Sequence, residues 1–157
     1  MSISPTIGSG LAGAAALNIL HEVLRRSTTD APRMDWLGKE VLAKSLKSVN
    51  IDPPKGTNMD IASLAGDILG NGGYYTIIGM GDPETAPLRG LLVGAAAGAG
   101  AILIPKYTGL NEKATNKNLA NQALTIGLYA LGGLAAGLAA MWIGRHKKSG
   151  QVQKALK

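Results

Sequence analysis

The sequence alternates between stretches without charge and short charged connectors, and this alternation limits the folds open to the chain. Lys, Arg, Asp and Glu are absent from residues 1–21, 90–105 and 118–144, while residues 61–81 carry only Asp67. A transmembrane helix needs about 20 mostly apolar residues, because it crosses about 30 Å of hydrocarbon at about 1.5 Å per residue. The pattern therefore predicts an all-α integral membrane protein with four apolar helices.

Composition excludes several other classes of protein. The 157 residues are 46% hydrophobic and 17% charged, and they include 22 Gly and no Cys. A disordered chain would carry more charge and less apolar content, while a disulfide scaffold or a thiolate zinc site would require cysteine. We therefore expect a single membrane domain over residues 1–157. Its predicted transmembrane helices cover about residues 5–24, 60–81, 87–106 and 120–144.

The second predicted helix, over residues 60–81, also has an alternative interpretation in which it does not cross the membrane. It is interrupted by Asp67 and by the triplet at 71–73, Asn-Gly-Gly. Glycine-rich backbone is tolerated at membrane depth only where protein or water satisfies its polar groups. A fold with three spans, in which residues 61–81 are re-entrant or interfacial, is therefore the alternative to a bundle of four transmembrane helices.

The distribution of Lys and Arg bears on this choice. Residues 25–55 contain seven of them, residues 106–117 three, the segment around Arg89 one, and the tail 145–157 five. Four spans divide these cations ten to six between the two sides of the membrane, and three spans divide them thirteen to three. The positive-inside rule prefers the second division. We still predict four spans, because 21 residues with one charge would otherwise need burial elsewhere.

Both topologies place the first connector on the same side. The segment 25–58 carries most of the cations in either count and is expected in the cytoplasm, with the N-terminus outside. Within it, Asp30 and Pro32 predict the start of an amphipathic helix over about residues 31–49. We expect this helix to lie in the membrane interface, where Trp36 would act as an anchor; a helix packed on a protein core or on a partner subunit has the same pattern.

Glycines recur at intervals of four residues, a spacing that places them on one face of a helix. Such stripes let helix backbones approach closely in lipid, where van der Waals packing holds helices together. With glycine this frequent, some of these spacings also arise by chance. The predicted packing positions are Gly66 and Gly70, then Gly90, Gly94 and Gly98, and finally Gly133 and Gly137.

A few polar residues fall inside the apolar segments. Asp67, Asn71 and Tyr74 share a face of one predicted helix, and Asn18 and His21 lie near the end of the first. An intramembrane acid near a histidine is a candidate for a proton relay or a ligand site. The simpler interpretation is a hydrogen-bonded clamp that fixes the register of the bundle.

Motifs for catalysis are absent from the sequence. It has no G-x-S-x-G elbow, H-E-x-x-H pair or phosphate-binding loop, and with two His and no Cys it cannot build a thiolate or multi-His metal site. We predict no catalytic residues, no metal and no cofactor. The basic tail lacks interleaved aromatic residues, so a nucleic-acid partner is not expected. Trp142 is a second candidate interfacial anchor.

The layout as a whole resembles a group of known proteins. An uncharged Gly/Ala-rich first helix ends in HEVLRR, APRMDWLGKE follows in the connector, and three more helices rich in small residues complete the chain. This plan resembles uncharacterised small polytopic proteins of bacterial inner membranes. The resemblance implies an inner-membrane location and four helices, but it brings no activity and no functional residues.

The function expected from the sequence is therefore structural. We expect an accessory subunit of a larger membrane complex or a self-associating bundle, whose partners are membrane lipids and other membrane subunits or further copies of the chain. The alternative is a small transporter or proton-conducting protein that uses the Asp67 and His21 pair.

Overall fold

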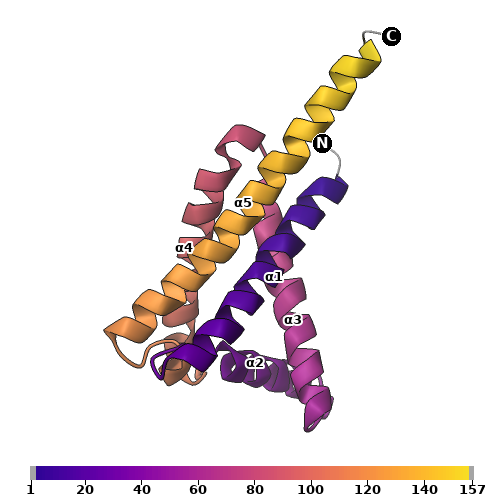
Figure 1. Cartoon of the computed structure of the whole chain (residues 1–157). Helices are drawn as coiled ribbons and strands as arrows, with labels where there is room; N and C mark the ends of the chain where they lie inside the picture. Colours follow the sequence, from indigo (N-terminus) through magenta and orange to yellow (C-terminus); the bar gives the residue numbers. More distant parts are fainter. Residues whose placement is uncertain (1–2, 156–157) are drawn as a thin grey trace.

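The protein is all-helical. The computed structural model describes the backbone of residues 3–155 and the side chains of residues 6–147, and it contains no strand in this part of the chain. Five α-helices and three short 3₁₀-helices follow one another (Figure 1). They are α1 (Ile3–Ser27), α2 (Met34–Ser48), α3 (Thr57–Tyr75), η1 (Thr76–Gly79), η2 (Pro83–Thr85), α4 (Ala86–Thr108), η3 (Glu112–Ala114) and α5 (Leu119–Ala155).

Three helical segments are long and apolar enough to cross a membrane. They are Thr6–Ser27, Pro83–Thr108 and Leu119–Lys147. The prediction of an all-α chain built on apolar helices is thus confirmed. α3 is not among the three, since Asp60, Asp67 and Asn71 lower its hydropathy.

α5 forms the centre of the bundle, with α4 packed on one side and α1 on the other (Figure 1). α4 and α5 pack against each other through their backbone atoms. A Cβ placed on Gly94 would overlap the carbonyl oxygen of Tyr129 and lie 2.9 Å from the Cα of Ala130. Gly90 and Gly133 face each other so closely that a Cβ on either would overlap the other's carbonyl oxygen. Glycine is therefore required for the two helices to approach this closely.

The contact between α1 and α5 is built around one aromatic side chain. Tyr75, at the end of α3, is fully buried, and its hydroxyl donates a 2.8 Å hydrogen bond to the carbonyl oxygen of Tyr129. Gly13 and Gly132 make room for it, because a Cβ on either would lie within about 3 Å of the ring or the hydroxyl. Ile78 is fully buried next to it. Together these residues fill the half of the bundle that lies away from α2.

The loops at that end are tied to the helices by two arginines. The guanidinium of Arg89 donates two hydrogen bonds, of 2.9 and 2.7 Å, to the carbonyl oxygen of Ile78. This carbonyl near the end of η1 therefore has a hydrogen-bond donor. Arg145 of α5 pairs with Glu84 of η2 at 2.6 Å. The segment between α3 and α4 therefore lies beside the later part of α5.

The two other connectors meet at the opposite end of the bundle. The backbone N–H of Arg33 donates to the carbonyl oxygen of Ala114 at 2.8 Å, and the N–H of Asn111 donates to Glu40 at 2.8 Å. Asn118 donates to the carboxylate of Asp30 at 2.9 Å. We call the contact of residues 30–44 with residues 109–121 the connector clamp. It places the segment after α1 and the segment before α5 side by side.

Several predicted boundaries are corrected by the structure. Residues 60–81 do not form one helix, because α3 tightens into η1 at Thr76, and the helix predicted over 120–144 begins at Leu119 and continues through the supposed tail to Ala155. The remainder of the tail, residues 156–157, lies outside the described residues. Asp30 is not a helix cap, since α2 begins at Met34 and the Asp30 carboxylate accepts from Asn118 instead.

The connector clamp carries a pH-dependent contact. The Asn111 N–H holds the pKa of Glu40 below its ordinary value; desolvation opposes this effect and the ammonium of Lys44 adds to it. A carboxylate with a lowered folded-state pKa stabilises the fold above its unfolded pKa of about 4.3, and this stabilisation is lost as the pH falls through the folded-state pKa.

We therefore expect the amide NMR signal of Asn111 to titrate with a midpoint below pH 4.3. The variant Glu40→Gln keeps a hydrogen-bond acceptor without the charge, so its Asn111 signal should stay constant through this range. A midpoint at or above the ordinary value would contradict the clamp.

Candidate functional site

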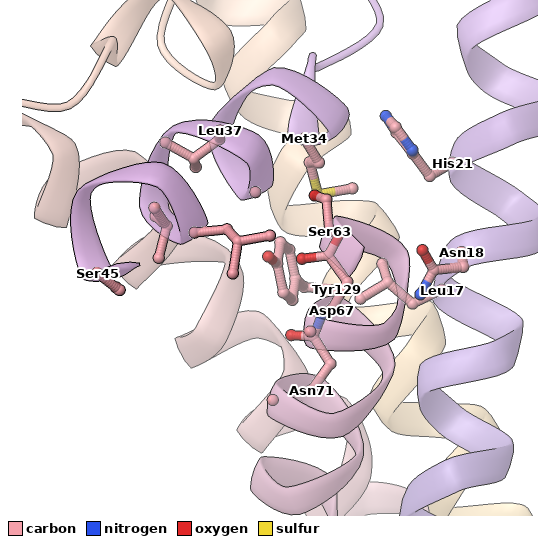
Figure 2. Close-up of a pocket in the computed structure, with 15 residues that line it drawn as sticks. Leu17, Asn18, His21, Met34, Leu37, Ser45, Ser63, Asp67, Asn71 and Tyr129 are labelled. Atoms are coloured by element: carbon pink, nitrogen blue, oxygen red, sulfur yellow. The ribbon is translucent and has the colours of Figure 1, made fainter. Parts of the chain in front are cut away.

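A cavity of about 360 Å³ lies between α2 and the middle part of α3 (Figure 2). Residues of α1, α2, α3 and α5 line it. Four of the five polar residues selected from the sequence contribute to it, namely Asn18, His21, Asp67 and Asn71. The fold therefore gathers most of the predicted intramembrane polar site in one place.

α3 supplies the polar wall of this cavity. Ser63, Asp67 and Asn71 recur every four residues and point from α3 toward α2 and Tyr129 (Figure 2). α2 can approach them because it presents Gly38 at the contact. A Cβ on Gly38 would lie 2.9 Å from Ser63 Oγ and 3.0 Å from Asp67 Oδ1, so a larger residue would push the carboxylate away.

Asp67 has no hydrogen-bond or ion-pair partner among the described residues. In the same part of the chain, no fully buried side-chain oxygen or nitrogen lacks a partner. The carboxylate oxygens of Asp67 must therefore be open to the cavity space. A carboxylate in this position can accept hydrogen bonds from a molecule that enters.

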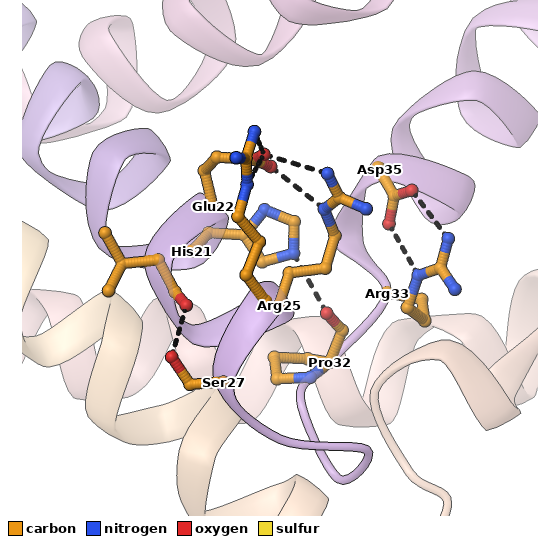
Figure 3. A network of polar contacts seen from close by, with 9 residues as sticks. His21, Glu22, Arg25, Ser27, Pro32, Arg33 and Asp35 are labelled. Atoms are coloured by element: carbon orange, nitrogen blue, oxygen red, sulfur yellow. Dashed lines mark hydrogen bonds and ion pairs between the residues drawn. The ribbon is translucent and has the colours of Figure 1, made fainter.

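His21 is close by but is engaged elsewhere (Figure 3). It is buried, and its Nε2 lies 2.9 Å from the carbonyl oxygen of Pro32. Because a carbonyl oxygen only accepts, Nε2 carries the proton and donates. The expected pair of Asp67 and His21 thus shares a cavity wall without a direct hydrogen bond, and His21 positions the turn that leads into α2.

A second and more polar cavity, of about 700 Å³, opens between α1 and α3. It shares Asn18, His21, Ser63 and Asp67 with the first, so these four side chains form the partition between the two. Its outer wall carries both signs of charge. The charged residues are Glu22, Arg25, Asp35, Lys39 and Asp60.

Each of these outer acids has a basic partner, and Figure 3 shows the pairs of Glu22 with Arg25 and of Asp35 with Arg33. Glu22 binds Arg25 at 2.9 Å, and Asp60 forms an ion pair with Lys39. Burial of Asp35 opposes its ionisation, but two hydrogen bonds from Arg33 outweigh this effect and hold its pKa below the ordinary value. Each of these carboxylates is therefore neutralised locally.

The other predicted positions lie away from the cavity. Tyr74 is half-exposed, and its hydroxyl donates to the carbonyl oxygen of Val93 on α4 at 3.3 Å. Trp36 is exposed on α2 with the Arg33 guanidinium 3.7 Å from its ring centroid. Trp142 is exposed on α5 with its ring 4.5 Å from that of His146. The two predicted anchors thus lie toward opposite ends of the bundle.

The glycine positions divide into two groups. Gly90, Gly94, Gly98, Gly133 and Gly137 all lie at the contact of α4 with α5, where a Cβ on any of them would meet backbone. Gly66 and Gly70 instead have no atom within 4 Å of a Cβ and line the cavity. This pair therefore makes no close helix contact within the described part of the chain, and its role in packing against another copy or another membrane helix stays a prediction.

Sequence reasoning missed Gly38, Ser63 and Tyr129. A glycine inside an amphipathic helix is a signal of close approach, and Gly38 was open to that interpretation. Ser63 lies one turn before Asp67 on the same face, so helical periodicity pointed to it. Tyr129 lies in an uninterrupted apolar segment, and nothing local distinguishes it from a packing residue.

A metal site is not indicated by this arrangement. Within residues 6–147, no three His, Asp or Glu side chains come close enough together to hold a metal ion. No protein-family model, curated protein or solved structure matches the chain.

Proposed function

We propose that this chain is a small integral membrane protein with four crossings and a structural or accessory role, located in the bacterial inner membrane. Three helices have the length and composition of membrane spans. Large apolar side chains are exposed along them, such as Leu88, Leu92 and Leu131. Such a surface suits contact with lipid or with other membrane helices.

The connector clamp is the observation that supports four crossings. If α1, α4 and α5 each cross once and residues 61–81 do not, then residues 30–44 and 109–121 lie on opposite sides of the membrane. In the fold these two segments are hydrogen-bonded to each other. A return of the chain across the bilayer between α1 and α4, through α3 and η1, would place both segments on the same side. The clamp therefore favours the ten-to-six division of cations over the thirteen-to-three division, with residues 25–58 cytoplasmic and the N-terminus outside.

A structural role is favoured by the way in which the bundle is filled. Conduction would need a polar route from one end of the molecule to the other. The polar side chains of the cavities lie in the half next to α2, while Tyr75 and Ile78 are fully buried in the other half. Backbone contacts at Gly10 and Gly72 close the space between α1 and α3 there. The same close packing would make the bundle a rigid platform for other subunits.

The topology can be tested by single-cysteine labelling, because the native chain contains no Cys. Suitable exposed positions are Lys47 in the first connector, Met80 between α3 and α4, and Glu112 in the second. We expect a membrane-impermeant maleimide to label Met80→Cys in intact cells. Lys47→Cys and Glu112→Cys should react only after the membrane is opened.

The three-span alternative predicts a different result. It places Met80 on the same side as Lys47 and places Glu112 opposite to them. Labelling of Glu112→Cys and Lys47→Cys from opposite sides would therefore refute four crossings. Recovery of the protein in the soluble fraction after carbonate extraction would refute the membrane location as well.

A further inference from the structure

Asp67 differs from every other acid around the two cavities. Glu22, Asp35 and Asp60 each have a basic side chain within ion-pair distance. Asp67 has none among the described residues, although it lies between both cavities and its oxygens are open to them. A carboxylate surrounded by apolar groups is costly unless a cation or hydrogen-bond donors compensate it. The missing partner is therefore a group that residues 6–147 do not supply.

The rest of the cavity determines what kind of cation fits. Its walls are mostly apolar and include Leu17, Met34, Val41 and the ring of Tyr129. Its volume of about 360 Å³ lies within the range of small-molecule sites, which is about 300–1,000 Å³. A hydrated inorganic ion would leave the apolar walls unused. An organic cation with a small apolar group would contact both the Asp67 carboxylate and the apolar walls.

Polar groups near Asp67 can also bind the ammonium group of such a cation. Asn71 and Ser63 line the same wall and offer oxygens that can accept from an ammonium group. His21 does not compete for Asp67, since its Nε2 is bonded to Pro32. The second cavity carries paired charges and gives a polar approach to Asp67 from the α2 end of the molecule.

We propose that the cavity is a binding site for a small organic monocation, such as a primary amine with an apolar or aromatic group. The ammonium group binds the carboxylate of Asp67, and the apolar group lies between Leu17, Met34 and Tyr129. The aromatic ring of Tyr129 adds a favourable surface for a cation. This site goes beyond a structural role and does not depend on the number of membrane crossings.

The test uses two probes of the same shape. Phenethylamine is positively charged near neutral pH, and 2-phenylethanol replaces its ammonium with a hydroxyl. We expect calorimetry on the full chain in phosphatidylcholine nanodiscs to give at least about tenfold tighter binding of the amine, which corresponds to about 1.4 kcal/mol. Equal affinities for the two probes, or no binding of the amine, would overturn the proposal.

Two variants locate the site. Asp67→Asn keeps the shape of the side chain and should abolish the preference for the amine, whereas Asp52→Asn removes an exposed acid of the connector and should preserve it. Gly66→Leu extends a side chain into open cavity space and favours the helix, so it should fold and weaken binding of the amine. Retained preference in Asp67→Asn, or unchanged affinity in Gly66→Leu, would place the amine elsewhere and refute the site.

Discussion

Replacement of Gly94 by alanine should lower the free energy of unfolding by about 3 kcal/mol. The added methyl group would overlap the carbonyl oxygen of Tyr129 and lie 2.9 Å from the Cα of Ala130. These atoms belong to the backbone of α5, so no side chain can rotate away, and the two helices must separate. Separation also weakens the neighbouring contact of Gly90 with Gly133, because all these glycines share one interface.

Gly100→Ala is the matched control on the same helix. A Cβ there has only the flexible end of Ile104 nearby, at 3.6 Å. Since alanine favours a helix over glycine by up to about 1 kcal/mol, this variant should be as stable as the native chain or slightly more stable. Thermal unfolding in detergent, followed by circular dichroism, compares the two. Equal behaviour of both variants would contradict backbone packing between α4 and α5.

Tyr75→Ala is expected to be at least as damaging, with a loss of about 3–5 kcal/mol. Tyr75 is fully buried where α1, α3 and α5 meet. The backbones of Gly13 and Gly132 pack directly against it. Removing the ring leaves a cavity that these backbones cannot collapse to fill. It also leaves the carbonyl oxygen of Tyr129 without the hydroxyl that donates to it.

The adjacent Tyr74 provides a control with the same chemical change. It is 39% exposed and donates only a long hydrogen bond to Val93, so Tyr74→Ala should cost about 1 kcal/mol or less. Tyr75→Phe keeps the ring and isolates the hydroxyl, with an expected cost of about 1 kcal/mol. A loss in Tyr74→Ala as large as that in Tyr75→Ala would contradict the central position of Tyr75. The same unfolding measurement distinguishes these results.

The apolar helices could be predicted from the sequence because their signal is local. Absence of charge over a whole segment identifies α4 and α5 without any tertiary information. The spacing of Gly90, Gly94 and Gly98 also names the face that contacts α5, since period four fixes one side of a helix. The common face of Asp67 and Asn71 follows from the same rule.

Other features depend on contacts distant in the sequence. Gly66 and Gly70 face open space beside residues of α2, and nothing in their local sequence indicates this. Asp30 looked like a helix cap because its local sequence permits one, but its carboxylate binds Asn118, far along the chain. Tyr129 lines the cavity because the fold brings α5 next to residues of α1, α2 and α3 that are far from it in the sequence. Local periodicity carries no information on such contacts.

The connector clamp also has a consequence for the order in which the molecule is assembled. Asp30, Arg33 and Glu40 find their partners within residues 109–121, which a ribosome adds long after α2 has been made. These bonds therefore form only after the segment between α4 and α5 has been synthesised. The cavity around Asp67, which is lined by α2 and by Tyr129 of α5, is complete only once α5 has been made as well.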